Sequence, residues 1–325
     1  MTAAIATTPA IESTPIERRL EALVELGRSL KDSGYQFTTV TPLTHAYNNE
    51  RYGQGWARDL RDVFGWARPF LPSLLPSTDF DLMLQAGVVR PYGEGWRSSI
   101  RWSSLGKNLF VHSGYPTSTT DAVFFGPDTY RFTRVLQQWL ASNPASPRRA
   151  VDIGCGSGAG AVTLACALPG CAVIATDINP QALQMTGINA RLAGVENLTP
   201  ALSNLLSDVD GQFDLIVANP PYMMDALERA YRHGGGELGA GLSIKIVLQS
   251  LKRLQPGGTL LLYTGVAMVN GQDPFLQHVS KILQQAACEW HYEELDPDVF
   301  SEELRRPEYA SVERIAAVCL RLTLR

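Results

Sequence analysis

The chain has 325 residues, a net charge of −4 and an apolar fraction of 45%, which is typical of a globular protein with one large or two ordinary domains. No apolar run approaches the ~20 residues that a membrane-spanning helix needs, so no membrane association is expected. Residues 1–116 carry a net charge of +1 and residues 117–325 one of −5. Neither part has the strong positive charge that is expected of a nucleic-acid-binding protein.

The first fifteen residues are rich in Thr, Ala and Pro and contain no Lys or Arg. We expect a disordered tail over 1–15, because a signal or transit peptide would carry positive charge. The five cysteines form no CxxC pair and no metal-ligand spacing, so no metal site is predicted. The odd number of cysteines and the absence of an export signal predict a cytoplasmic location.

Residues 16–116 predict a small α+β domain. An amphipathic helix is expected over 16–33 and is followed by Gly34, a typical helix stop. Two further helical segments and two strands are expected: 56–68, Thr78 or Asp79 to about Leu84, 96–103 and 108–112. Helices followed by a β-hairpin suggest a winged-helix-like domain for substrate recognition.

Four basic residues near the predicted hairpin, opposed by Glu94, give it a local charge of +3: Arg90, Arg97, Arg101 and Lys107. Such a basic wing could contact RNA or a protein partner. The alternative is an ordinary small core with a solvated charged wing.

Residues 117–325 predict a second domain. A strand is expected over 121–125 and a helix from there to about 142, before a linker-like break at 143–147. Strands and helices then alternate. The strands are expected at 150–153, 172–176, 199–203, 213–218, 259–263, 290–295 and 315–322, and the helices at 158–168, 180–192, 224–232, 243–254 and 274–287. This order predicts an α/β fold with a doubly wound, seven-stranded, mostly parallel sheet and an antiparallel last strand.

A glycine-rich loop follows the first of these strands. Gly154-Cys155-Gly156-Ser157-Gly158 lets the backbone approach a ligand closely, and Asp177 ends the next strand, where an acid can accept both ribose hydroxyls. The same spacing satisfies the dinucleotide pattern, so a nicotinamide enzyme stays open at this point. Alternatively, Asp152 could only cap the loop and Asp177 only cap the helix that begins at Pro180.

Asn219-Pro220-Pro221-Tyr222 follows the strand at 213–218. The prolines fix two φ angles and remove two backbone donors, so the Pro220 carbonyl can point into a cleft. An amide, a fixed carbonyl and an aromatic ring suit the grip of a planar nitrogen group. The alternative is a rigid loop without chemistry.

The glycine loop, the acid after the second strand and the Asn-Pro-Pro-Tyr turn together resemble the class I S-adenosylmethionine-dependent methyltransferases, over residues 120–325. The turn is similar to that of the HemK-type glutamine methyltransferases of release factors and of adenine or guanine N-methyltransferases. The resemblance implies that Asp152 and the loop hold the methionine part of the cofactor, Asp177 the ribose and Asn204 the adenine amine. The cofactor-binding set is then Asp152, Gly154, Cys155, Gly156, Gly158, Asp177, Ile178, Asn204 and Asn219.

The resemblance also implies the residues that meet the substrate. Asn219, Pro220 and Tyr222 are the implied catalytic residues, and Pro221, Tyr222 and Thr129 the implied substrate-binding residues. Thr129 belongs to Pro127-Asp128-Thr129, which resembles a Pro-Asp-Thr-Glu element of the HemK type with Tyr130 in place of the Glu. Asn204 stands where the family usually has an acid. His233-Gly234-Gly235-Gly236 is either a flexible helix exit or part of a lid.

These patterns predict an N-methyltransferase that acts on a protein glutamine amide, with a release-factor-like protein as partner. The alternatives are a base N-methyltransferase of rRNA or tRNA, acting at adenine N6 or guanine N2, and a small-molecule N-methyltransferase. A nicotinamide oxidoreductase and an inactive methyltransferase-like binding module belong to other classes.

Overall fold

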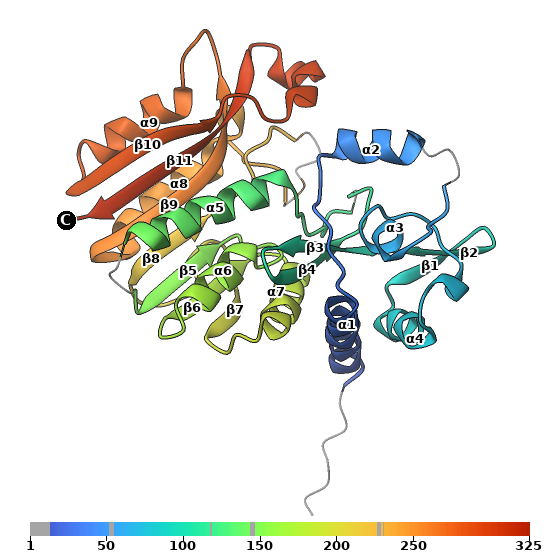
Figure 1. Ribbon diagram of the computed structural model, residues 1–325. Helices are drawn as coiled ribbons and strands as arrows, with labels where there is room; N and C mark the ends of the chain where they lie inside the picture. Colours follow the sequence, from blue (N-terminus) through green and yellow to red (C-terminus); the bar gives the residue numbers. More distant parts are fainter. Residues whose placement is uncertain (1–13, 52–54, 118, 144–146, 226–228, 230) are drawn as a thin grey trace, which may run out of the picture.

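The computed structural model describes residues 14–51, 55–117, 119–143, 147–225, 229 and 231–325 (Figure 1). Most of the expected tail at 1–15 and of the expected linker at 143–147 lies outside the described residues. Within the described residues, no helix is both long and apolar enough to cross a bilayer.

A seven-stranded sheet organises the second half of the chain, as predicted. Its strand order is β10-β11-β9-β8-β5-β6-β7, and β11 runs antiparallel to both of its neighbours. The strands are β5 (Arg149–Ile153), β6 (Ala172–Asp177), β7 (Leu198–Leu202), β8 (Phe213–Ala218), β9 (Leu254–Met268), β10 (Cys288–Asp296) and β11 (Arg314–Leu324).

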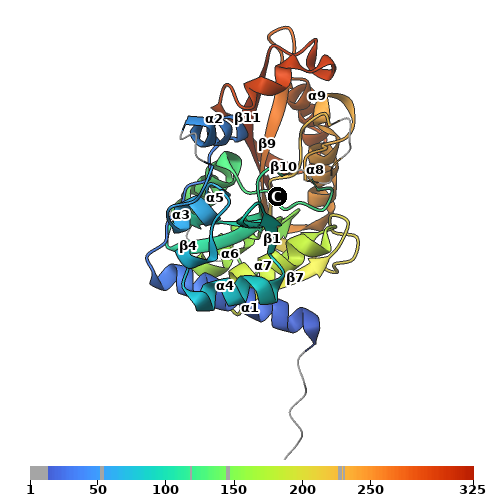
Figure 2. The same cartoon turned by 90° about the vertical axis from the view of Figure 1, so that its right-hand side faces the viewer.

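Helices cover both faces of this sheet because its strands are apolar on both sides. In β5, Ala150 packs against the layer of α5 and α6, whereas Val151 and Ile153 pack against α8 and α9. Figure 2 shows these helix pairs on opposite sides of the sheet. The helices are α5 (Pro127–Ser142), α6 (Ala159–Ala167), α7 (Pro180–Ala193), α8 (Gly241–Arg253) and α9 (Pro274–Leu283), with short 3-10 turns at Glu237–Gly239, Ser301–Arg305 and Pro307–Tyr309.

The chain reverses its direction of winding between β5 and β8. It runs from β5 outward to β6 and β7, and then returns to β8 on the other side of β5. Ile153 is paired with both Ala218 and Thr176, so the loops that follow β5, β8 and β6 leave the sheet side by side. Ligands bind at this point in doubly wound folds.

Four helices and two hairpins make up the described residues before α5. The helices are α1 (Pro15–Asp32), α2 (Pro42–Arg51), α3 (Leu60–Phe64) and α4 (Ser77–Ala86), with a 3-10 turn at Pro72–Leu74. The hairpins are β1 (Val89–Tyr92) with β2 (Gly95–Ser98) and β3 (Ile100–Leu105) with β4 (Asn108–Ser113). Gly34, at φ +73°, ends α1 as predicted.

This N-terminal part shares its apolar core with α7. Leu26 and Leu30 of α1 and Trp102 of β3 are buried in one cluster with Ile188 and Leu192 of α7. The Asn189 side chain, also on α7, accepts a bond from the backbone amide of Val111 and donates to the carbonyls of Val111 and Ser157 at 3.1 and 2.8 Å. Asn189 therefore joins β4 to the glycine loop.

Several predicted elements of the N-terminal part are wrong in extent. The helix expected over 56–68 is only α3, because Asp59 caps it and Gly65 ends it. The strand expected over 96–103 breaks at Ser99 into β2 and β3, which belong to different hairpins. Pro76, not Thr78 or Asp79, precedes the first turn of α4. Helix α2 was not predicted, because His45 is its only buried residue and no apolar stripe marks it.

Two further predicted elements near the site are not found among the described residues. Residues 121–125 form no strand. Val123 exchanges hydrogen bonds with Ser113, but its described neighbours are not paired with a strand. The helix expected over 224–232 includes 226–228 and 230, which lie outside the described residues. Its described residues are not helical, and Met223 instead forms a bridge with His233.

The prediction of an exposed basic wing is wrong. Arg101 is buried at 5% exposure and donates to the carbonyl of Ser113, and Arg97 lies 4.4 Å from the centre of the Tyr92 ring. Arg90 and Lys107 are exposed, but they lie on separate hairpins. The four basic side chains therefore do not form one patch.

Candidate active site

A cavity of about 210 Å³ opens where β5, β6 and β8 end. Most of the predicted site residues line it: Thr129, Asp152, Gly154, Cys155, Gly156, Asp177, Ile178, Asn204, Asn219, Pro220, Pro221 and Tyr222. Gly158 does not, although it belongs to the same loop. Gly158 precedes the first residue of α6 and has a φ angle of +79°. A Cβ atom at this position would lie 2.8 Å from Cγ2 of Thr186, so the glycine allows α6 to pack closely on α7.

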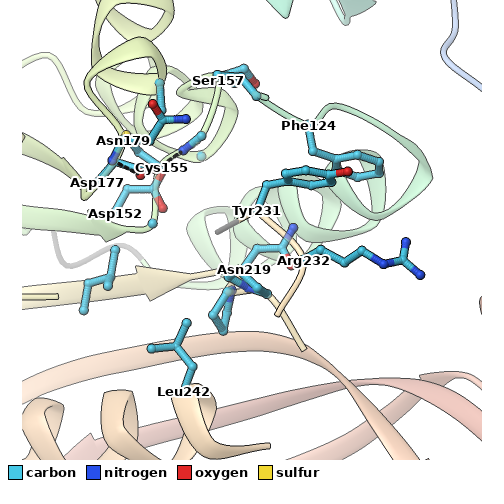
Figure 3. Close-up of a pocket in the computed structure, with 18 of the residues that line it drawn as sticks. Phe124, Asp152, Cys155, Ser157, Asp177, Asn179, Asn219, Tyr231, Arg232 and Leu242 are labelled. Atoms are coloured by element: carbon cyan, nitrogen blue, oxygen red, sulfur yellow. Dashed lines mark hydrogen bonds between the residues drawn. The ribbon is translucent and has the colours of Figure 1, made fainter. Parts of the chain in front are cut away.

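The glycine loop is held by the neighbouring strand and its acid. The amides of Gly154 and Cys155 donate to the carbonyl of Thr176, at 2.8 and 2.9 Å. The amide of Gly156 donates to Asp177 Oδ2 at 2.9 Å, drawn as a dashed line in Figure 3, and the amide of Asn179 donates to Oδ1. Asp177 is therefore not the cap of α7. Asn179 is, because its side chain accepts from Gln181.

Asp152 lies beneath the loop and is 1% exposed. Its Oδ2 accepts a 2.8 Å bond from the amide of Ala161 in the first turn of α6. Burial raises the pKa of Asp152 to about 7, and the nearby Asp177 carboxylate adds to this shift. Burial also raises the pKa of Asp177. Two carboxyl groups thus face one cavity without a basic side chain bonded to either among the described residues.

Ile178 and Asn204 lie at the β6–β7 side of the cavity. Ile178 is 55% exposed although it is apolar, and Asn204 is exposed as well. An exposed apolar side chain beside a cavity is a contact surface for a flat ligand ring.

Asn219 extends from the end of β8 into the cavity. Figure 3 shows its amide pointing toward Tyr231 and Arg232. Among the described residues no hydrogen bond holds this amide. Because Ala218 pairs with Ile153, Asn219 and Gly154 leave adjacent strands at the same level. This amide therefore faces the space beside the glycine loop.

Tyr222 is placed differently from Asn219. Its ring is 8% exposed, lies edge-to-face with Phe300 at 6.0 Å, and covers Gly265 of β9. Its hydroxyl donates to the buried carboxylate of Asp128. Little of the ring is left for stacking on a ligand.

The family comparison agrees with this geometry. Residues 117–285 match the methyltransferase small domain family. The chain belongs to this methyltransferase family. The match confirms the prediction of an S-adenosylmethionine-dependent methyltransferase, and the strand order described above confirms the predicted sheet.

Curated relatives resemble parts of this methyltransferase. It is 38% identical over 125 residues to a release factor glutamine methyltransferase of Deinococcus radiodurans, covering 35% of this chain and 44% of that protein. It is 34% identical over 141 residues to a ribosomal protein uL3 glutamine methyltransferase of Neisseria gonorrhoeae, covering 40% and 47%. The chain thus spans about half the length of these relatives. A solved structure, Trm5b of Pyrococcus abyssi, is 14% identical with a TM-score of 0.48, covering 72% of this chain and 62% of that one.

The cavity of the methyltransferase fits S-adenosylmethionine by the chemistry of its lining. Asp177 offers carboxylate oxygens for two hydroxyls, and the buried Asp152 offers a negative charge for an ammonium group. The glycine backbone lets a ligand approach closely, since Gly156 adopts φ +54°. The ribose hydroxyls and the ammonium group of the methyl donor therefore each have a matching carboxyl group in the lining.

Further residues of the cavity are not among the predicted site residues. They are Phe124, Asp128, Tyr231, Arg232, Leu242 and Phe300. Figure 3 shows Phe124 and Tyr231 on the same side of Asn219. The Tyr231 hydroxyl donates to the carbonyl of Thr117 at 2.9 Å, which holds its ring at the cavity. Asp128 alone carried a signal, as part of the Pro127-Asp128-Thr129 element.

Thr129 and Tyr130 serve the scaffold. Thr129 Oγ1 accepts from the amide of Gly126 at the start of α5, although the residue also lines the cavity. The Tyr130 hydroxyl accepts a 3.0 Å bond from the amide of Thr39, and its ring meets Phe125 edge-to-face. Tyr130, which replaces a glutamate of the family pattern, is therefore used to attach the N-terminal part.

Proposed function

We propose that this enzyme transfers a methyl group to the side-chain nitrogen of a protein glutamine. The observation that carries the proposal is the Asn219 amide, which points into the cavity beside the glycine loop and has no partner among the described residues. The names of the relatives support the acceptor class, since both proteins methylate glutamine in a translation protein. The chain spans about half of their length, and the acceptor class is part of this proposal.

The proposed chemistry needs orientation more than acid–base groups. The lone pair of an amide nitrogen is delocalised, which makes the nitrogen a poor nucleophile. Asn219 Oδ1 and the Pro220 carbonyl would accept its two N–H groups and aim the nitrogen at the methyl carbon. S-adenosylmethionine would supply an activated methyl group there, and S-adenosylhomocysteine would be the leaving group. As positive charge grows on the nitrogen these two bonds strengthen, so the transition state gains more than the ground state. The proton leaves to water.

We assign Phe124 and Tyr231 to the planar faces of the acceptor. Both line the cavity and lie on one side of Asn219 (Figure 3). Tyr222 was the predicted stacking residue, but its ring is buried against Phe300 and Gly265. We propose for Tyr222 a role in holding the turn instead.

Residues 16–116 are proposed as the recognition domain, with a winged-helix-like arrangement. Contacts that reach the site support this role: Tyr130 to Thr39 on one side, and Asn189 between Val111 and Ser157 on the other. The loss of the basic wing favours a protein partner over RNA. All five cysteines are free thiols, which fits the proposed cytoplasmic location.

The test is incubation of the enzyme with labelled S-adenosylmethionine and cell extract, followed by digestion with protease or nuclease. We expect protease alone to release the label, and hydrolysis of the labelled protein to yield methylated glutamine. Release by nuclease would assign the acceptor to RNA, and label in neither fraction would favour a small molecule or an inactive binding module. Asn219→Ala serves as the control, and we expect it to lose most of the turnover while it still binds S-adenosylhomocysteine.

A further inference from the structure

Asp128, in the first turn of α5, binds side chains from α5 itself, from β9 and from the turn that follows β8. Its carboxylate accepts from the hydroxyl of Tyr222, from the hydroxyl of Tyr263 on β9 at 2.8 Å, and from Arg131 at 3.1 Å. Arg131 also donates to Asp296 of β10 at 2.8 Å. Asp128 is 3% exposed. A buried carboxylate with three donors is a strong and directional anchor, because charge-assisted hydrogen bonds are stronger than neutral ones.

The ring of Tyr222 has little freedom apart from this anchor. A Cβ atom on Gly265 would lie 2.1 Å from Tyr222 Cε2, so the ring lies directly on the β9 backbone. Phe300 covers its other side edge-to-face. The position of the ring therefore depends on its contact with the Gly265 backbone in β9 and on the hydrogen bond from its hydroxyl to Asp128, which we call the tether.

The hydrogen bond between Tyr222 and Asp128 is linked to the Asn219-Pro220 acceptors by two prolines. Asn219 and Tyr222 are separated only by Pro220 and Pro221, whose φ angles are fixed. A displacement of Tyr222 is thus passed to the Pro220 carbonyl and the Asn219 amide with little local relaxation. Errors of about 1 Å in such acceptors are costly for transfer reactions.

We propose that Asp128 is a positioning residue for methyl transfer, which acts through the Tyr222 hydroxyl to set the two acceptors of the Asn219-Pro220 turn. This inference rests on the proposed function of that turn. It also gives a purpose to the Pro127-Asp128-Thr129 element that is independent of direct substrate contact.

A double-mutant cycle tests the coupling. The variants are Asp128→Asn, Tyr222→Phe and the double variant, assayed for the rate of label transfer to extract protein and for affinity toward S-adenosylhomocysteine. Each single variant is expected to lose about tenfold to a hundredfold in rate, the range of one charge-assisted hydrogen bond, with cofactor affinity within about twofold. The double variant should be no slower than the slower single variant. Losses that multiply would overturn the proposal.

Tyr263→Phe is the matched control, since it removes the other tyrosine hydroxyl from Asp128 without touching the turn. We expect it to lower the melting temperature and to leave the transfer rate within about threefold. A Tyr263→Phe loss as large as that of Tyr222→Phe would mean that Asp128 acts only through general stability, and would also overturn the proposal.

Hydrogen exchange separates this inference from the proposed function. In the peptide that contains Asn219 and Tyr222, Asp128→Asn and Tyr222→Phe should both speed amide exchange, whereas Tyr263→Phe should not. Unchanged exchange in both variants refutes the tether. If the wild-type enzyme labels no protein, the proposed acceptor is wrong, and the exchange result still decides whether Asp128 holds the turn.

Discussion

The carboxylate of Asp177, at the end of β6, accepts a 2.9 Å hydrogen bond from the backbone amide of Gly156 in the glycine loop. A second amide, of Asn179, binds the other oxygen. The carboxylate is thereby fixed with both oxygens at the edge of the cavity. One residue thus shapes the loop and offers acceptors for ribose hydroxyls.

We predict that Asp177→Asn weakens the affinity for S-adenosylhomocysteine by about tenfold to a hundredfold, because hydrogen bonds to a charged acceptor contribute about 1.5–3 kcal/mol. Titration calorimetry measures the effect. Asp208→Asn is a suitable control, since Asp208 is exposed and does not line the cavity. Equal affinities of wild type and Asp177→Asn would contradict the ribose assignment.

A pH dependence follows from Asp152. Its pKa of about 7 means that the carboxyl group is mostly protonated below neutrality in the cofactor-free enzyme, and an ammonium group needs it ionised. Affinity for S-adenosylhomocysteine should therefore rise with pH, by about tenfold between pH 6 and pH 8, and then level off. Asp152→Asn should bind more weakly at pH 8 and show a flat profile.

The same shift affects stability with the opposite trend. The folded-state pKa of Asp152 lies above its ordinary value of 3.8, so the folded protein binds the extra proton between these pH values. Its contribution to the free energy of unfolding is lost as the pH rises toward about 7. Thermal unfolding without cofactor should show Asp152→Asn gaining over wild type at pH 8 and not at pH 4. If Asp152→Asn is no more stable than wild type at pH 8, the ionised Asp152 carboxylate does not destabilise the folded protein.

Tyr231 provides a test of the acceptor site. Its ring lines the cavity, and its hydroxyl is bound to the Thr117 carbonyl. Tyr231→Ala should raise the KM for the protein acceptor about tenfold, in line with the ~1–3 kcal/mol of a stacking contact, with little change in cofactor affinity. Tyr231→Phe keeps the ring and should stay within about threefold. If both variants lose equally, the hydroxyl rather than the ring is what matters.

Gly265→Ala should displace Tyr222 by steric contact alone. The new methyl group would overlap the ring, and overpacking of this kind costs about 1–3 kcal/mol. We expect a loss in transfer rate of more than tenfold with cofactor affinity retained. Gly187→Ala, in α7, is the matched control because nothing lies within 4 Å of its added Cβ. It should raise stability by about 0.5–1 kcal/mol.

Much of the site followed from the sequence because its markers are local. The glycine loop, Asp177 and the Asn-Pro-Pro-Tyr turn each lie directly after a strand, and strand ends meet in a parallel sheet. Phe124 and Tyr231 could not be placed in this way. They reach the cavity from irregular segments whose course depends on single tertiary bonds, such as that between Tyr231 and Thr117.

The N-terminal part was harder to predict for a different reason. Helix α2 buries only His45, whose ring contacts those of Trp66 and Tyr115, so no periodic apolar pattern marks it. It also makes polar contacts: Asn48 and Asn49 accept from Arg68, and Asn49 donates to the carbonyl of Trp66. Arginine is usually found at the protein surface, but Arg101 is buried near Tyr35, Tyr115 and Tyr130. Charge counts assume exposure on one surface, whereas Arg101 is buried and the exposed Arg90 and Lys107 lie on separate hairpins.

Gly27 of α1 meets α7 at the point where a Cβ would lie 2.6 Å from Leu192 Cδ1 and 2.9 Å from Trp102. The two helices thus touch across the boundary between the proposed recognition domain and the catalytic fold. Lys31 and Glu21 of α1 add bonds to Leu192 and Arg191. We therefore expect the two parts to melt in a single transition. We expect a chain shortened to begin at residue 117 to aggregate, because the apolar face of α7 that α1 covers would then be exposed to water.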